Sequence, residues 1–117
     1  MMNPSNSLGT HLLVDYWGGE RLDDVAHIER ALVQAALACG AQVLEVKLHS
    51  FGEKSGVTGV ALLAESHISI HTWPERDYAA LDIFMCGQCD PRLALPVLED
   101  LFRPGQVKVM EINRGEK

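Results

Sequence analysis

The sequence is poor in basic residues and has no long apolar run. Its 117 residues carry ten Lys and Arg against sixteen Asp and Glu, a net charge of −6. So few cations cannot offset phosphate repulsion, and we expect no nucleic-acid partner. No apolar run approaches the ~20 residues that a membrane-spanning helix needs, so no membrane association is expected. Because Met1–Thr10 is polar and lacks a signal-peptide hydrophobic region, we expect a cytoplasmic protein.

Cysteine and aromatic residues are also scarce. The three cysteines, Cys39, Cys86 and Cys89, are an odd number, which argues against a disulfide framework and favours a chemical role. Aromatic residues make up 6% of the chain. The remainder, 47% hydrophobic and 22% charged, is typical of one globular domain, which we expect to cover residues 1–117.

Hydrophobic periodicity predicts two helices. The first begins at an N-cap, Asp23, and is stopped by Gly40. The second begins at Asp90-Pro91 and runs through Phe102, although Pro96 interrupts its hydrogen bonding.

Alternating or apolar segments predict six strands around these helices. The resulting order, β-α-β-β-β-β-α-β, predicts an α+β two-layer sandwich, in which two helices cover one face of a mainly antiparallel sheet. The other face would be free to cover a partner subunit. The predicted strands are Leu12–Trp17, Gln42–Ser50, Val57–Ala64, His67–Trp73, Tyr78–Cys86 and Gln106–Ile112, with Phe51–Gly56 as a loop.

The reactive side chains gather between Ala64 and Glu75. This stretch holds Ser66, a latent nucleophile, and His71, a group suited to acid–base work near neutral pH. Cys86 follows at the end of the next predicted strand. Taken singly, each has an ordinary structural explanation: a turn serine, a hydrogen-bonded strand histidine and a small buried thiol. Residue types alone therefore indicate only a polar sheet face with functional potential.

The complete string of residues from Glu65 to Glu75 is more specific than any of these residues taken singly. Glu65-Ser66-His67 followed by Ile70-His71-Thr72-Trp73-Pro74-Glu75 resembles the signature of prokaryotic S-adenosylmethionine decarboxylase proenzymes, the short pyruvoyl-dependent type. The resemblance covers nearly the whole chain in register. Its further segments are Leu8-Gly9-x-His11, Gly40-Ala41, His49-x-Phe51, Gly56-Val57-Thr58-Gly59-Val60, Tyr78-Ala79-Ala80-Leu81-Asp82, Cys86-Gly87, Asp90-Pro91 and Arg114-Gly115.

This resemblance implies self-cleavage at a strained turn between two strands. Ser66 would attack the carbonyl group of Glu65, and elimination with His71 as the processing base would leave a pyruvoyl group. The products would be a β chain, residues 1–65, and an α chain, residues 66–117. Thr58 stands where relatives usually have a processing serine; it keeps the hydroxyl but is stiffer, so we expect a changed rate rather than loss of processing.

The resemblance also implies the catalytic parts. The covalent pyruvoyl group would form a Schiff base with the substrate amine and replace pyridoxal phosphate, and no metal is expected. Cys86 matches the proton donor. Phe51 and Trp73 would be aromatic neighbours of the substrate, and Glu75 would accept hydrogen bonds from ribose hydroxyls.

The implied activity is decarboxylation of S-adenosylmethionine to S-adenosylmethioninamine, the aminopropyl donor for spermidine synthesis. Relatives of this type are dimers in which each site contains residues of both protomers. We therefore expect a homodimer of αβ protomers with its sites near the interface.

Two departures leave the substrate open. The loop after Phe51 is one residue longer than in many relatives, and Asp77, beside Arg76, replaces a common glycine. The same pyruvoyl chemistry could therefore act on another amino acid, such as arginine or ornithine.

Two further alternatives use the same residues differently. A non-enzymatic metal or redox module could use His67-x-x-x-His71 and Cys86-x-x-Cys89. However, strand residues four apart are ~13 Å apart, and one cysteine pair is a weak motif. An inactive homologue that serves only as a partner subunit is the other alternative, and the intact Ser66, His71 and Cys86 argue against it.

Overall fold

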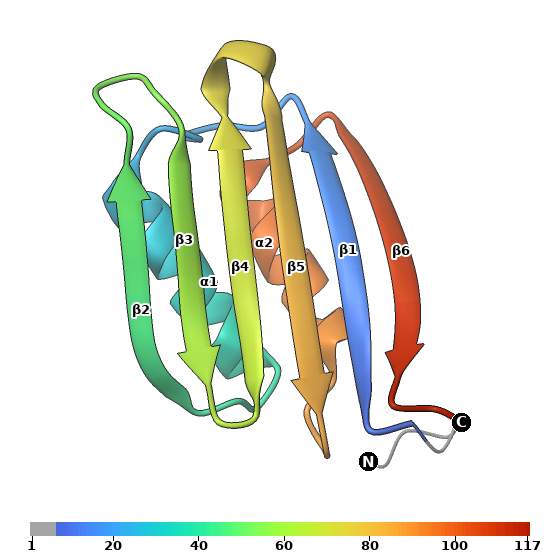
Figure 1. The fold of residues 1–117 in the computed structure, drawn as a ribbon. Helices are drawn as coiled ribbons and strands as arrows, with labels where there is room; N and C mark the ends of the chain where they lie inside the picture. Colours follow the sequence, from blue (N-terminus) through green and yellow to red (C-terminus); the bar gives the residue numbers. More distant parts are fainter. Residues whose placement is uncertain (1–6) are drawn as a thin grey trace.

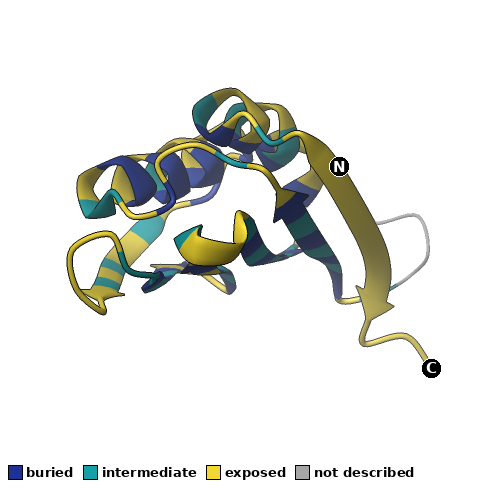
Figure 2. Cartoon of the chain, turned by 90° about the horizontal axis from the view of Figure 1, so that it is seen from above, coloured by how far each residue is buried: buried dark blue, intermediate teal, exposed yellow. Residues whose placement is uncertain are grey.

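Six strands form a single antiparallel sheet in the computed structural model, which describes residues 7–117. Two helices cover one of its faces (Figures 1 and 2). This confirms the predicted α+β class and element order. The first six residues of the polar N-terminal segment lie outside the described residues. In spatial order the strands are β2 (Val43–Ser50), β3 (Val57–Leu63), β4 (Ser66–Trp73), β5 (Tyr78–Cys86), β1 (Gly9–Trp17) and β6 (Gln106–Arg114).

The first helix, α1 (Val25–Ala38), begins one residue later than predicted. Its N-cap is Asp24, not Asp23, because Asp24 has extended backbone angles and its carboxylate accepts a hydrogen bond from the His27 backbone N–H at 3.1 Å. This hydrogen bond is the main reason that the pKa of Asp24 is lowered. The predicted stop at Gly40 agrees with its left-handed φ of 80° just after the helix.

The second helix has a different beginning from the predicted one. Pro91–Leu93 form a 3-10 turn, η2, which Asp90 caps by accepting from the Arg92 N–H at 3.0 Å. The α-helix α2 then covers Ala94–Phe102. Pro96 lies in its first turn, where backbone N–H groups have no partner within the helix, so the proline does not interrupt it.

The core lies between the sheet and the helices. Ile68 and Ile70 of β4 point into it, and both are fully buried. The two helices also contact each other, since a ring nitrogen of His27 lies 2.7 Å from the Leu101 carbonyl oxygen.

The other side of the sheet, which we call the open face, has no helix over it (Figure 2). Alternating residues of the strands point to this side, in register with one another. Large apolar side chains are exposed here, including Trp17, Leu62 and Met110 at 47%, 44% and 48%. Exposed apolar surface of this kind is typical of an interaction site. The polar and aromatic members used below are His11, Asp15, Thr58, His67, Ser69, His71, Trp73, Tyr78, Asp82 and Phe84.

Replacing Gly56 by alanine is expected to destabilise the sheet. A Cβ atom at Gly56 would lie 2.3 Å from the Thr72 carbonyl oxygen, so β3 and β4 would have to separate at this end. We expect Gly56→Ala to cost about 1–3 kcal/mol in urea unfolding at equal protein concentration. Gly105→Ala is the control, because its Cβ would meet nothing closer than the Trp17 carbonyl oxygen at 3.6 Å. Equal stability of the two variants would contradict the close approach.

Candidate active site

The turn between β3 and β4 contains backbone strain at the bond predicted to be cut. Leu63 pairs with Ser66, so Ala64 and Glu65 alone form the turn. Glu65 has a φ of 61°, in the left-handed region that costs a non-glycine residue about 1–2 kcal/mol. The strained turn expected from the sequence is therefore present, and the residue that carries the strain is the one before Ser66.

Ser66 and Cys86 lie together at this turn because β4 begins where β5 ends. The Cys86 backbone N–H donates to Ser66 Oγ at 3.4 Å. The Cys86 thiol donates to the carbonyl oxygen of Glu65, with Sγ 2.9 Å from that oxygen. Ser66 is buried and Cys86 is half-buried. A hydroxyl, the neighbouring carbonyl group and a thiol thus form one cluster, the Ser66–Cys86 cluster.

His71 and Thr58 form a second group. They are paired across β4 and β3, and Thr58 Oγ1 lies 3.1 Å from His71 Nδ1. Both line a cavity of about 630 Å³ that also contains the three residues predicted to bind substrate. Together the lining residues are Phe51, Lys54, Ser55, Gly56, Thr58, His71, Thr72, Trp73 and Glu75. Five of these nine were predicted from the sequence to have a role in the site; the other four belong to the loop after Phe51 and to β4.

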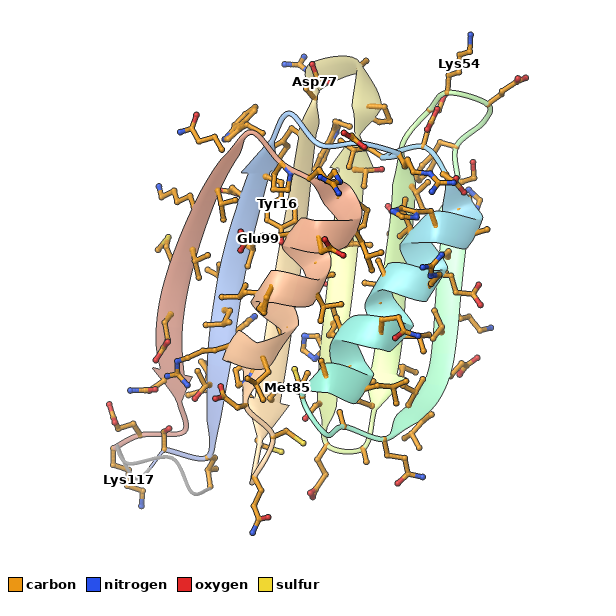
Figure 3. The ribbon with its side chains drawn as sticks, turned by 180° about the vertical axis from the view of Figure 1, so that it is seen from behind. Tyr16, Lys54, Asp77, Met85, Glu99 and Lys117 are labelled. Atoms are coloured by element: carbon orange, nitrogen blue, oxygen red, sulfur yellow. The ribbon has the colours of Figure 1, made fainter. Side chains whose placement is uncertain are left out.

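The two groups lie at opposite ends of the sheet. Ser66 and His71 are five residues apart on one extended strand, a separation of about 16 Å. Figure 3 shows Met85, next to Cys86, at the end away from Lys54 and Asp77. Ser66 shares the helix side of β4 with Ile68, whereas His71 belongs to the open face. Within one chain, the structure therefore does not bring the predicted base to the predicted nucleophile.

A stack of aromatic rings supports one wall of the cavity. Trp73 stacks on Tyr78 with ring centroids 5.3 Å apart, and Tyr78 packs on Trp17 at 4.4 Å. The Tyr78 hydroxyl donates to Asp15 Oδ1 at 2.6 Å. This hydrogen bond, with burial and the Asp15 charge as smaller causes, raises the pKa of Tyr78 to about 12. No role for Asp15 or Tyr78 was predicted from the sequence, because only the pairing of β1 with β5 brings them together.

A polar network at the centre of the open face was also missed. His11 Nε2 lies 3.0 Å from Asp82 Oδ1, and Ser69 Oγ donates to the other carboxylate oxygen at 3.3 Å. Arg114 lies 3.2 Å from the second His11 nitrogen. His11 and Asp82 both belong to the segments that matched the family. Strand alternation could have placed them on one face, but their pairing depends on β1 joining the sheet beside β5.

The departure at Asp77 has a backbone explanation. Asp77 follows the 3-10 turn η1 (Pro74–Arg76) with a φ of 50°. Glycine adopts this conformation without strain, and aspartate tolerates it better than most residues. The longer loop also contains a left-handed residue, Lys54, whose side chain extends away from the molecule (Figure 3). Neither departure closes the cavity.

Two features are absent from the described part of the chain. Within residues 7–117, no three His, Cys, Asp or Glu side chains are grouped so that they could hold a metal ion. In the same range, no helix is long and apolar enough to cross a bilayer.

The fold, the Ser66–Cys86 cluster and the paired His71 and Thr58 define an α+β protein with a serine at a strained hairpin. Residues 10–115 match the family model described as S-adenosylmethionine decarboxylase. An S-adenosylmethionine decarboxylase proenzyme of Methanococcus vannielii is 50% identical over 111 residues, 92% of this chain and 90% of the relative. Another proenzyme of that name, from Thermomicrobium roseum, is 43% identical over 110 residues, covering 93% and 95% of the two chains.

A solved structure agrees with these relatives. The crystal structure of the adenosylmethionine decarboxylase from Aquifex aeolicus VF5 superposes with a TM-score of 0.84 at 32% identity, covering 95% of this chain and 93% of the other. The chain belongs to the S-adenosylmethionine decarboxylase family. The resemblance inferred from its sequence is thereby confirmed.

The Tyr78 phenol provides a pH test of the aromatic stack. In a Tyr16→Phe variant Tyr78 is the only tyrosine, and its absorbance should titrate near pH 12. Asp15→Asn should move that titration toward pH 10, the usual value. Because folding raises this pKa, its contribution to stability is complete below about pH 10 and is lost as the pH rises toward 12. A titration unaffected by Asp15→Asn would refute the assigned hydrogen bond.

Proposed function

We propose that this chain is a self-processing, pyruvoyl-dependent S-adenosylmethionine decarboxylase that cuts its own Glu65–Ser66 bond. The observation that carries the proposal is the Ser66–Cys86 cluster at a left-handed Glu65. The names of the relatives and the family match support the same reaction. The product would be the aminopropyl donor for spermidine synthesis.

Cleavage begins with Ser66. Its Oγ attacks the Glu65 carbonyl carbon, the peptide C–N bond breaks, and an ester joins Glu65 to the serine oxygen while the nitrogen takes the proton. The Cys86 thiol, 2.9 Å from the carbonyl oxygen, is placed to stabilise the negative charge that develops there. The strain at Glu65 is relieved as its carbonyl group moves.

The ester then breaks by elimination. A base removes the Cα proton of residue 66, and the Glu65 carboxylate leaves as the new C-terminus of the β chain, residues 1–65. Water replaces nitrogen at residue 66, ammonia departs, and the α chain, residues 66–117, begins with the pyruvoyl group. Thr58 and His71 supply a hydroxyl and a base held 3.1 Å apart.

The base must come from a second chain, because His71 of the same chain is about 16 Å from Ser66. Two copies packed through their open faces, related by a two-fold axis perpendicular to the strands, bring the Ser66 end of one against the cavity end of the other. His71 of the partner subunit then lies at the Ser66 end of β4, on the open-face side of the sheet, to which the Cys86 side chain belongs by alternation. The exposed Trp17, Leu62 and Met110 would be covered by this arrangement. The resulting homodimer has two sites, each built from both protomers.

The residues also fit the decarboxylation step. The pyruvoyl group supplies an electron-accepting carbonyl next to an amide. Phe51 and Trp73 present exposed rings to an adenine, and Glu75 presents a carboxylate to ribose hydroxyls. Cys86 lies beside residue 66, where a thiol proton can be delivered to the substrate carbon.

A mixed-chain experiment tests the shared site. Ser66→Ala and His71→Ala proenzymes should each remain uncut when expressed alone. When they are expressed together, a mixed dimer contains one complete site, formed by Ser66 of the His71→Ala chain and His71 of the Ser66→Ala chain. We expect only the His71→Ala chain to be cut, in up to about half of the dimers, as seen by intact mass. No cleavage in verified mixed dimers would refute the shared site.

The assigned roles of Cys86 predict two separable defects. Cys86→Ala should slow cleavage about tenfold or more, because a donor to the developing oxyanion is lost. It should also reduce kcat of the fraction that is cut. Cys86→Ser keeps a donor and should cleave faster than Cys86→Ala. If both variants cleave at the wild-type rate, Cys86 does not assist cleavage and acts only in turnover.

Substrate identity is tested at Glu75. Glu75→Gln should cut itself normally but raise KM for S-adenosylmethionine about tenfold, since hydrogen bonds to a charged acceptor are lost. Carbon dioxide release should be measured from S-adenosylmethionine, arginine and ornithine. Release from either amino acid exceeding that from S-adenosylmethionine would assign the alternative substrate.

A further inference from the structure

The turn that follows β5 brings two cysteines close together. Cys86 ends the strand, Gly87 adopts a left-handed φ of 67°, and the Cys89 N–H donates to the Cys86 carbonyl oxygen at 3.4 Å. In a turn closed in this way the outer Cα atoms are less than ~7 Å apart. A disulfide spans Cα separations of about 4.4–6.8 Å. The backbone therefore needs little movement to join the two thiols, both of which are free and half-buried.

Cys39 is the competing partner for Cys89. It lies at the end of α1, is almost fully buried and packs in the core. Burial raises the pKa of Cys39 to about 12, and the thiol form that this favours is a poor nucleophile. Cys86, in contrast, is half-exposed beside the cleavage turn, so an oxidant reaches it more readily.

We propose that Cys86 and Cys89 form a reversible disulfide, an oxidative modification site that removes the working thiol of the candidate active site. With a peroxide as the oxidant, the Cys86 sulfur takes an oxygen atom to become a sulfenic acid, and the peroxide leaves as water or an alcohol. The Cys89 thiol then attacks that sulfur. The sulfenic oxygen leaves as water, which carries away the Cys89 thiol proton, and the S–S bond forms.

The disulfide would remove two interactions of the Cys86 thiol at once. The first is its hydrogen bond to the Glu65 carbonyl oxygen, so oxidised proenzyme cleaves more slowly. The second is its transferable proton, so oxidised processed enzyme does not turn over. The effect on turnover rests on the proposed function, whereas formation of the disulfide does not. Cys89 also protects Cys86, because a disulfide prevents irreversible oxidation to the sulfinic acid.

The test uses the full protein, cut and reduced, then freed of reductant and treated with hydrogen peroxide. Free thiols, intact mass and the linked peptides are measured together with carbon dioxide release. We expect the loss of two thiols, a Cys86–Cys89 peptide, and an activity loss of more than tenfold that dithiothreitol restores. A Cys89→Ser variant should be as active as the reduced protein but lose activity irreversibly, with sulfinic acid at Cys86. Cys39→Ala should behave like the unchanged protein.

Peptide mapping keeps this inference separate from the proposed function. A Cys86–Cys89 link supports it even in protein without decarboxylase activity. A Cys39–Cys89 link would overturn it. Loss of activity while Cys86 and Cys89 both remain free thiols would also overturn it. Equally reversible inactivation of Cys89→Ser would overturn it as well.

Discussion

The length of an extended strand fixes the distance between the two ends of the candidate site. Ser66 and His71 belong to the same strand, β4, and each residue of a strand advances the chain by about 3.3 Å. No side-chain rotation closes a gap of about 16 Å. The hairpin with β3 and the pairing with β5 then divide the reactive groups, with the serine, thiol and strained carbonyl at one end and the histidine and cavity at the other. A chain folded in this way keeps the predicted nucleophile and the predicted base at opposite ends of the sheet.

Most of the fold could be predicted from the sequence because hydrophobic periodicity and turn residues are local patterns. Alternating residues indicated the strands, and the order of elements along the chain followed from turn residues between apolar segments, whereas the position of β1 between β5 and β6 was not predicted. The errors occurred where neighbouring residues compete. Asp23 and Asp24 are equivalent N-caps by composition, and only the backbone angles select Asp24. The start of α2 was placed too early because a capped proline opens a 3-10 turn as readily as an α-helix.

The candidate site was predicted in its parts but not in its arrangement. Glu65-Ser66 and Cys86 were named from the family resemblance, and the sheet brings them together as required. The sequence did not indicate that Asp15 would hold Tyr78, or that His11 would meet Asp82, because these pairs span more than sixty residues. Their contacts exist only because β1 inserts between β5 and β6. Long-range strand pairing leaves no signal in local periodicity.

The strand order also governs what the proposed cleavage of the Glu65–Ser66 bond would do to the two segments that it separates. The segment before Ser66 contributes β1, β2 and β3, and the segment after Glu65 contributes β4, β5 and β6. In the sheet, β1 lies between β5 and β6, while β3 pairs with β4. Strands of the two segments therefore alternate in the sheet. Neither segment could dissociate without breaking the backbone hydrogen bonds of β1 to both β5 and β6. The proposed cleavage would change the covalent connectivity while the strand pairing holds the two segments together, so the precursor would have to acquire its full topology before it is cut.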